Sequence, residues 1–194
     1  MANKDAAFGL RPAHMMGGAP YSGGQSRYRI ANNQSGAIFQ GDLVKQLTGG
    51  TVSRAAAGSA VPVVGVFNGC QYTDPTSQEQ VFSNYYPGAV AADDIIAFIV
   101  DDPDVVFEVQ ADDTFPVADL FGNFDIVYTS SGSTVTGISG AELDVATGAT
   151  GTSLPLKAID ISGDPENSDV ASANTNVLVV IQNHIFGVKG AGLA

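Results

Sequence analysis

The chain has 194 residues, of which 44% are hydrophobic, 14% are charged and 23 are glycine. This composition predicts a folded, turn-rich all-β protein and excludes a disordered one. The net charge of −12 argues against nucleic acid as a partner, because nucleic-acid binders need a basic surface. No apolar run approaches the roughly 20 residues of a membrane span, and Met1–Leu10 has no signal-peptide core, so we expect a soluble protein made in a cytoplasm, with no membrane partner.

The charge is distributed unevenly along the chain. Residues 1–54 hold six basic and two acidic side chains, whereas the remainder holds two basic and 18 acidic ones. This asymmetry predicts that the N-terminal third docks onto an acidic neighbour. The alternative is pairing within the chain or between copies of it.

Residues 1–24 are predicted to form an extended N-terminal arm, because closely spaced glycines and prolines exclude a long helix. No strand-length alternation occurs before Ser26. The arm still carries spaced apolar residues, which suit binding along another protein's surface. The alternative is that it folds back on its own domain, which we predict to be one β-rich unit over residues 25–194.

The first predicted strands are Ser26–Ala31 and Ala37–Phe39. A compact antiparallel module follows over Gly41–Gly69, where Gly-rich turns join short strands at little loop-closure cost. Its predicted strands are Leu43–Leu47, Val52–Arg54 and Val61–Phe67. The module contains no catalytic signature.

The middle of the chain combines aromatic and acidic segments. Asp74-Pro75 predicts the start of a short helix. Phe82, Tyr85 and Tyr86 form the densest aromatic cluster, which is either an interface anchor or a core plug beneath a long loop. Ile95–Val100 and Val105–Gln110 flank a Pro-containing polar turn, which predicts a hairpin.

The last third is predicted to hold one short helix and four strands. Thr114–Phe121 fits a helix of one to two turns, with Pro116 in its first turn and Gly122 after its end. The segment from Ile185 to Ala194 is expected to trail along the surface. The four strands are Asp125–Tyr128, Glu142–Val145, Leu156–Ile161 and Val177–Gln182.

The sequence predicts no catalytic residues, no cofactor and no metal site. It contains neither a nucleophile elbow nor a phosphate-binding loop, and His14 and His184 lie at opposite ends of the chain. The single cysteine, Cys70, excludes an internal disulfide and fits a buried small side chain. The Asp pairs leave a carboxylate-dependent hydrolase or a calcium site as minor alternatives, although such pairs in turns are usually solvated.

Three stretches resemble one group of structural proteins. The first is the order of short motifs in the Gly41–Gly69 module, which begins with GDLV and ends with VGVFNG. The other two are ANKDAAFGLRP at the N-terminus and FSNYYPGAVAADDIIAFIVDDP at 82–103. The module is similar to the small β-barrel of tailed-phage head decoration (cement) proteins, and the other two stretches resemble structural proteins of bacteriophages, especially marine ones.

The resemblance implies a small β-barrel or sandwich with an extended arm, long loops and one or two very short helices. It implies a non-enzymatic virion protein on the capsid exterior, which binds the major capsid protein and self-associates, with a homotrimer favoured. The expected contacts are arm residues and aromatics: Lys4, Phe8, Leu10, Arg11, Pro12, Phe82, Tyr85 and Tyr86. The alternative is an adhesion or glycan-binding β-sandwich at a head-fibre base, with Tyr85 and Tyr86 stacking on sugar.

Overall fold

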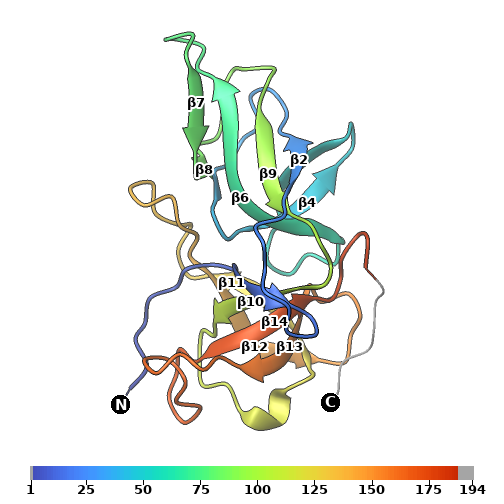
Figure 1. Cartoon of the computed structure of the whole chain (residues 1–194), viewed down its shortest axis with the longest axis vertical. Coiled ribbons are helices and arrows are strands. Elements are labelled where there is room, and N and C mark those ends of the chain that lie inside the picture. The colour runs from blue at the N-terminus through green and yellow to red at the C-terminus, as the bar shows by residue number, and fades with distance from the viewer. Residues whose placement is uncertain (1, 188–194) are drawn as a thin grey trace.

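The computed structural model describes residues 2–187 and contains two stacked β-lobes (Figure 1). One lobe is a closed barrel built from residues 26–100, and the other is a six-stranded antiparallel sheet, here called the lower sheet. The only helical element among the described residues is a single turn of 3₁₀-helix, η1 (Val117–Asp119). The predicted all-β fold with a small barrel is therefore confirmed.

Fourteen strands are found among the described residues of the two lobes. The lower sheet contains, in spatial order, β1 (Arg11–Met15), β10 (Val105–Gln110), β14 (Asn176–Ile181), β13 (Leu156–Ile161), β11 (Asn123–Tyr128) and β12 (Ala141–Ala149). The barrel lobe contains, in spatial order, β4 (Leu43–Leu47), β5 (Thr51–Arg54), β2 (Ser26–Arg29), β9 (Ile96–Val100), β6 (Val63–Thr73) and β7 (Gln80–Ser83), with a separate pair of β3 (Ile38–Phe39) and β8 (Tyr85–Tyr86).

The predicted Gly41–Gly69 module forms the centre of the barrel. Strand β4 pairs antiparallel with β5 on one side and with β6 on the other, and the turn at 48–50 lets Leu47 pair directly with Thr51. Strand β9 then pairs with both β2 and β6, and β2 meets β5 in one parallel pairing, which closes five strands into a barrel.

The predicted hairpin between Ile95–Val100 and Val105–Gln110 is wrong. Strand β9 belongs to the barrel and β10 to the lower sheet, so residues 101–104 are a crossing between lobes. The cause is burial, because Val100 and Val105 both belong to the core between the lobes. The Tyr28 hydroxyl secures the crossing by donating a 2.7 Å hydrogen bond to Asp101.

The N-terminal segment follows the alternative in which it folds back on its own chain. Strand β1 pairs antiparallel with β10, although no strand was predicted before Ser26. Its register shifts between Pro12 and His14, and this bulge breaks the alternation that marks a strand in sequence. Strand β1 lies at the sheet edge, where proline is tolerated.

The two predicted helices are turns. At 74–79 the Asp74 side chain accepts hydrogen bonds from the N–H groups of Thr76 and Ser77, which caps the loop joining β6 to β7. At 114–121 only η1 is helical. Phe115 is fully buried and Phe121 has a φ of 68°, so the segment cannot continue as a regular helix.

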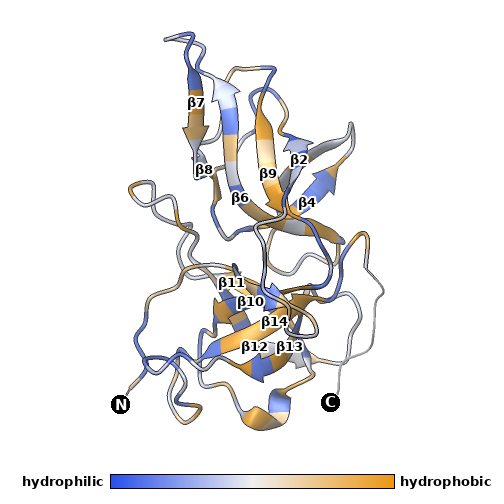
Figure 2. Cartoon of the chain, in the orientation of Figure 1, coloured by the Kyte–Doolittle hydropathy of each residue, from blue (hydrophilic) through white to orange (hydrophobic). Residues whose placement is uncertain are grey.

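Two hydrophobic clusters form the core, and one of them joins the lobes. One fills the barrel interior, and the other lies between the lower sheet and the base of the barrel. The second cluster includes Leu43, Val63 and Val66 from the barrel together with Phe107 and Phe124 from the lower sheet. The apolar colouring of β9 and β14 in Figure 2 follows these two clusters.

The described C-terminal end joins the lobes at His184, and of the predicted trailing segment Ile185–Ala194 only residues 185–187 are among the described residues. Residues 183–185 run beside Val63, whose N–H donates to the Asn183 carbonyl and whose carbonyl accepts from the N–H of Ile185, each at 2.9 Å. His184 is 1% exposed, and its Nδ1 accepts from the N–H of Phe186 at 3.0 Å.

His184 should make stability depend on pH. Burial lowers its pKa, against the raising effects of Asp101, Asp102 and a hydrogen bond with the Val64 backbone. The unfolded chain therefore takes up the proton more readily, so the His184 contribution is complete above about pH 6.5 and is lost as the pH falls toward the folded-state pKa. Urea unfolding between about pH 7.5 and about pH 5.5 should show a smaller loss of unfolding free energy in His184→Gln than in the unmodified protein.

The matched control is His14→Gln, which removes the only other histidine. This variant should keep the pH dependence of the unmodified protein. An unchanged pH dependence in His184→Gln would show that the buried imidazole is not its source.

Candidate partner-binding groove

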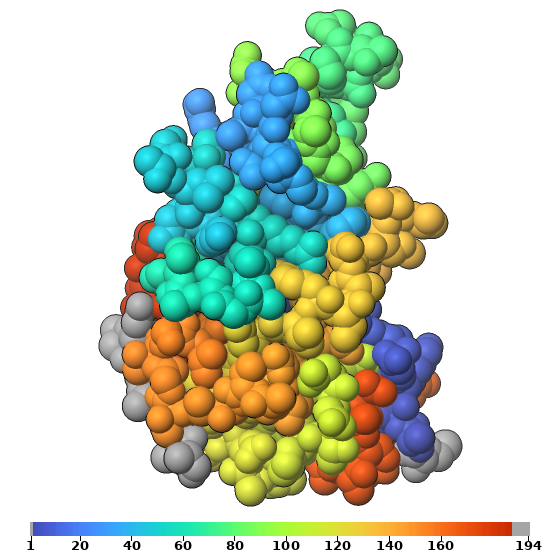
Figure 3. Space-filling view, turned by 180° about the vertical axis from the view of Figure 1, so that it is seen from behind, coloured from blue at the N-terminus to red at the C-terminus, as the bar shows by residue number. Residues whose placement is uncertain are grey.

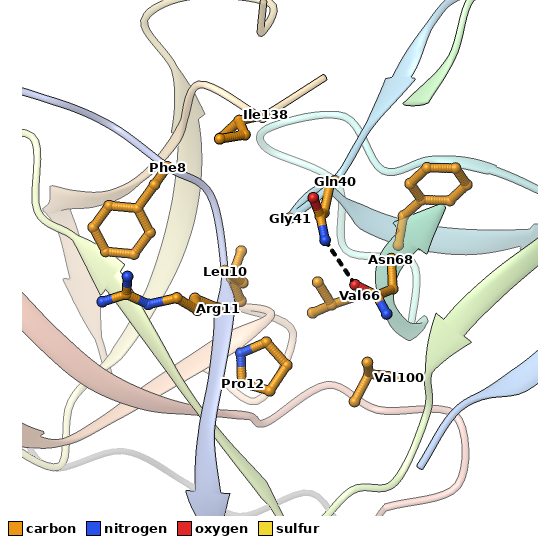
Figure 4. Close-up of a pocket in the computed structure, with 11 residues that line it drawn as sticks. Phe8, Leu10, Arg11, Pro12, Gln40, Gly41, Val66, Asn68, Val100 and Ile138 are labelled. Atoms are coloured by element: carbon orange, nitrogen blue, oxygen red, sulfur yellow. Dashed lines mark hydrogen bonds between the residues drawn. The ribbon is translucent and has the colours of Figure 1, made fainter. Parts of the chain in front are cut away.

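An open groove lies where the N-terminal segment crosses the barrel (Figure 4). Its volume is about 200 Å³. The N-terminal segment and loop 129–140 form one side, and β6, the end of β9 and the bend after β3 form the other. The lining residues are Phe8, Leu10, Arg11, Pro12, Gln40, Gly41, Val66, Phe67, Asn68, Val100 and Ile138.

The groove has an apolar floor and a mixed rim. Leu10, Val66 and Val100 are buried and belong to the core between the lobes. On the rim, Gln40 donates through Nε2 to Asn68 Oδ1 at 2.9 Å. Ile138, 39% exposed, faces them as an apolar rim residue. A partner protein that presents a hydrophobic side chain next to a polar one would fit this arrangement.

Two glycines fix the N-terminal segment against the barrel. Gly9 and Gly41 have φ of 70° and 96°, and the N–H of Leu10 donates to the Gly41 carbonyl at 2.9 Å. A Cβ on Gly9 would lie 2.8 Å from that carbonyl oxygen. A side chain at either position would therefore push the two lobes apart at the groove.

Arg11 is held by Glu108 of β10. Its guanidinium forms an ion pair with the Glu108 carboxylate and lies 4.8 Å from the centre of the Phe8 ring. Burial raises the pKa of Glu108, but hydrogen bonds from Ser162 and Arg11 and the Arg11 charge outweigh this effect, so the net pKa is lowered. Most of the Arg11 side chain stays exposed, at 61%.

The rest of the N-terminal segment is anchored through polar contacts. Asn3 donates through Nδ2 to the carbonyls of Asp169 and Ala173, at 2.9 and 3.0 Å. Gln110 donates to the Lys4 carbonyl at 2.8 Å and accepts from the N–H of Ala6 at 3.0 Å. Of the five predicted arm contacts, four therefore line the groove, and Lys4 is exposed outside it.

The three predicted interface aromatics lie in different environments. Tyr86 is fully buried and packs inside the barrel, so it is a core residue and not a surface contact. Tyr85 is half-buried and stacks on Phe39, with ring centres 5.6 Å apart. Phe82, on β7, is 67% exposed. Because Tyr86 is buried, only Tyr85 of the two tyrosines is left for the sugar-stacking surface expected of an adhesion module.

Loop 129–140 connects this aromatic region to the groove. Asn84 donates through Nδ2 to the Thr136 carbonyl at 2.5 Å, and a Cβ on Gly137 would meet the Asn84 side chain. The loop therefore packs against the β7–β8 segment. Figure 3 shows the same loop, in gold, lying on the surface between the barrel and the N-terminal segment.

The candidate reactive groups are used structurally. Asp94 accepts hydrogen bonds from Thr73, and Asp112 accepts one from the N–H of Val145. Cys70 is 1% exposed, and burial raises the pKa of its thiol to about 12. Over residues 2–187 no cluster of three or more His, Cys, Asp or Glu side chains is placed to hold a metal ion. Within the same range no helix has the length and hydrophobicity to cross a membrane.

Comparison with known proteins gave no relative. No protein-family model, curated protein or solved structure matches the chain.

The groove residues outside the N-terminal segment were not predicted from the sequence. Gln40, Asn68 and Ile138 lie in segments that look like ordinary polar turns or strand ends. The residues that flank them are mostly uncharged. Such sequence does not distinguish the rim of a groove from an ordinary turn. Only the pairing of β4 and β6, together with the packing of the 129–140 loop, brings them together.

Proposed function

We propose that this protein is a non-enzymatic virion component that binds the outer surface of a bacteriophage capsid and bridges subunits of the major capsid protein. The proposal rests on the decoration-protein resemblance of the Gly41–Gly69 module. The observation that carries it is that Phe8, Leu10, Arg11 and Pro12, the predicted contacts of the N-terminal segment, line one open groove beside that module. The protein would act after assembly in the host cytoplasm, on the capsid exterior, and would associate with copies of itself.

The groove would receive an apolar side chain from the shell. Because the N-terminal segment is already paired with β10 and tied to loop 163–175, binding would not have to order it. Such preorganisation lowers the entropic cost of association. The exposed Arg11 guanidinium would orient an acidic or amide group next to the inserted side chain.

Capsid binding should depend on the apolar rim. Ile138→Lys places a charge at the groove mouth without removing a buried side chain, and we expect capsid affinity to fall about tenfold or more. The measurement is co-sedimentation of purified protein with capsids that lack it. Deleting Met1–Pro12 is a less selective test, because Leu10 belongs to the core.

The matched control is Val117→Lys, which puts the same charge on an apolar residue 55% exposed on η1. This variant should bind as the unmodified protein does. Equal capsid binding by the Ile138→Lys and Val117→Lys proteins would reject the groove as the contact. A failure of the unmodified protein to bind capsids would reject the function itself.

A further inference from the structure

The two lobes carry very different charge. Residues 25–100 hold four basic and five acidic side chains, whereas the rest of the chain holds four basic and fifteen acidic ones. Every charged residue inside a barrel strand is basic: Arg27, Arg29, Lys45 and Arg54. Most of the charged residues in the strands of the lower sheet are acidic. The molecule is therefore polarised along its long axis.

Three of the four basic residues lie on the outside of one barrel wall. Tyr28 and Val44 contribute to the barrel core, so the alternate residues Arg27, Arg29 and Lys45 face outward. Arg54 shares the inward face of β5 with Val52 and reaches the buried Asp42. Arg27 and Arg29 are exposed on β2, and the hydrophilic colouring of β2 and β4 in Figure 2 marks this wall. The three strands contain no acidic residue.

A pocket of about 640 Å³ lies beside this wall, where β4 and β5 meet loops 34–37 and 131–134. Lys45 and Ser53, paired across the two strands, line it with Arg54. Ser35, Ser131 and Thr134 are also among the lining residues. No acidic side chain lines the pocket, and Lys45 has no ion pair among the described residues.

Arg54 adds a second positive charge to the lining of this pocket. Its Nε lies 3.2 Å from Asp42 Oδ2, and its guanidinium lies 3.6 Å from the centre of the Tyr128 ring. The pocket therefore carries two basic side chains, of which Lys45 is the one without an ion pair in the part of the chain that the structure describes.

We infer that this pocket binds a carboxylate from the acidic lower lobe of a second copy of the chain. We assign this carboxylate to a second copy because of charge complementarity, since each copy presents a basic wall at one end and a large acidic excess at the other. Because the two surfaces differ, the contact is head-to-tail, and it forms a ring when the rotation closes. This contact would be the interface of the proposed self-association, and the inference rests on that proposal.

Self-association of the purified full-length protein tests the inference without capsids, so its outcome is separate from that of capsid binding. Sedimentation velocity should show oligomers at low salt that dissociate as salt is added. Lys45→Glu should weaken the association about tenfold or more, whereas Lys45→Arg should retain it. Thermal unfolding of each variant checks that the fold is intact.

The charge-matched control is Lys4→Glu, which changes the net charge equally but lies in the exposed N-terminal segment. It should weaken association far less than Lys45→Glu. Equal effects of the two reversals would overturn the inference, because net charge would then explain both. A protein that stays monomeric at low salt would overturn it as well.

Discussion

Replacing Gly65 by alanine is expected to lower the free energy of unfolding by about 3 kcal/mol, because the barrel has no room for a side chain there. A Cβ on Gly65 would lie 2.2 Å from the carbonyl oxygen of Val100. That oxygen belongs to the backbone of β9, next to the crossing between lobes, so it cannot rotate away as a side chain would. The barrel wall would have to open between β6 and β9.

Thermal unfolding measures this effect. For a chain of this length, 3 kcal/mol corresponds to a fall in Tm of roughly 10 °C. The matched control is Gly163→Ala, since a Cβ on Gly163 would have no atom within 4 Å and the residue has no left-handed φ. That variant should be neutral or slightly stabilising. An equal Tm for the two variants would contradict the close packing of β6 against β9.

Asp42→Ala is expected to lower the free energy of unfolding by about 4 kcal/mol, because it removes an acceptor shared by three partners in a buried site. Asp42 is fully buried and accepts hydrogen bonds from the N–H of Phe39 at 2.8 Å and the Ser139 hydroxyl at 2.5 Å. Its ion pair with Arg54 would also be lost. The effect should be similar in size to that of Gly65→Ala.

Asp42→Asn separates the charge from the hydrogen bonds. Burial raises the pKa of Asp42 despite the opposing effects of Arg54, Phe39 and Ser139, so ionisation is less favourable at this site than in water. The amide keeps one acceptor, and we expect Asp42→Asn to destabilise less than Asp42→Ala in urea unfolding. Equal losses would instead assign the stabilisation to the charge.

Strand positions were largely predictable from sequence, but their partners were not. Leu43–Leu47, Val105–Gln110 and Leu156–Ile161 match observed strands residue for residue. Alternation and turn residues are local signals, and they define where a strand begins and ends. Pairing depends on which sheet buries a side chain, so the adjacent strands β9 and β10 were assigned to one hairpin although they lie in different lobes.

Only the N-terminal residues of the candidate groove were predictable from the sequence, for a related reason. Apolar residues in a Gly- and Pro-rich segment indicate contacts, and the N-terminal residues were identified on that basis. The sequence could not show whether those contacts are internal, and Leu10 is now part of the core while Arg11 stays exposed. The same ambiguity applied to Phe82 and Tyr86, which lie four residues apart but differ completely in burial.

The placement of the barrel between β1 and β10 has a consequence for synthesis on the ribosome. All barrel strands lie within residues 26–100, so this lobe can close while the rest of the chain is still being made. Strand β1 emerges first but must wait for β10, about 90 residues later, before it can pair. Until then Leu43, Val63 and Val66 at the base of the barrel lack their cover, and the nascent chain is most exposed to aggregation during this interval.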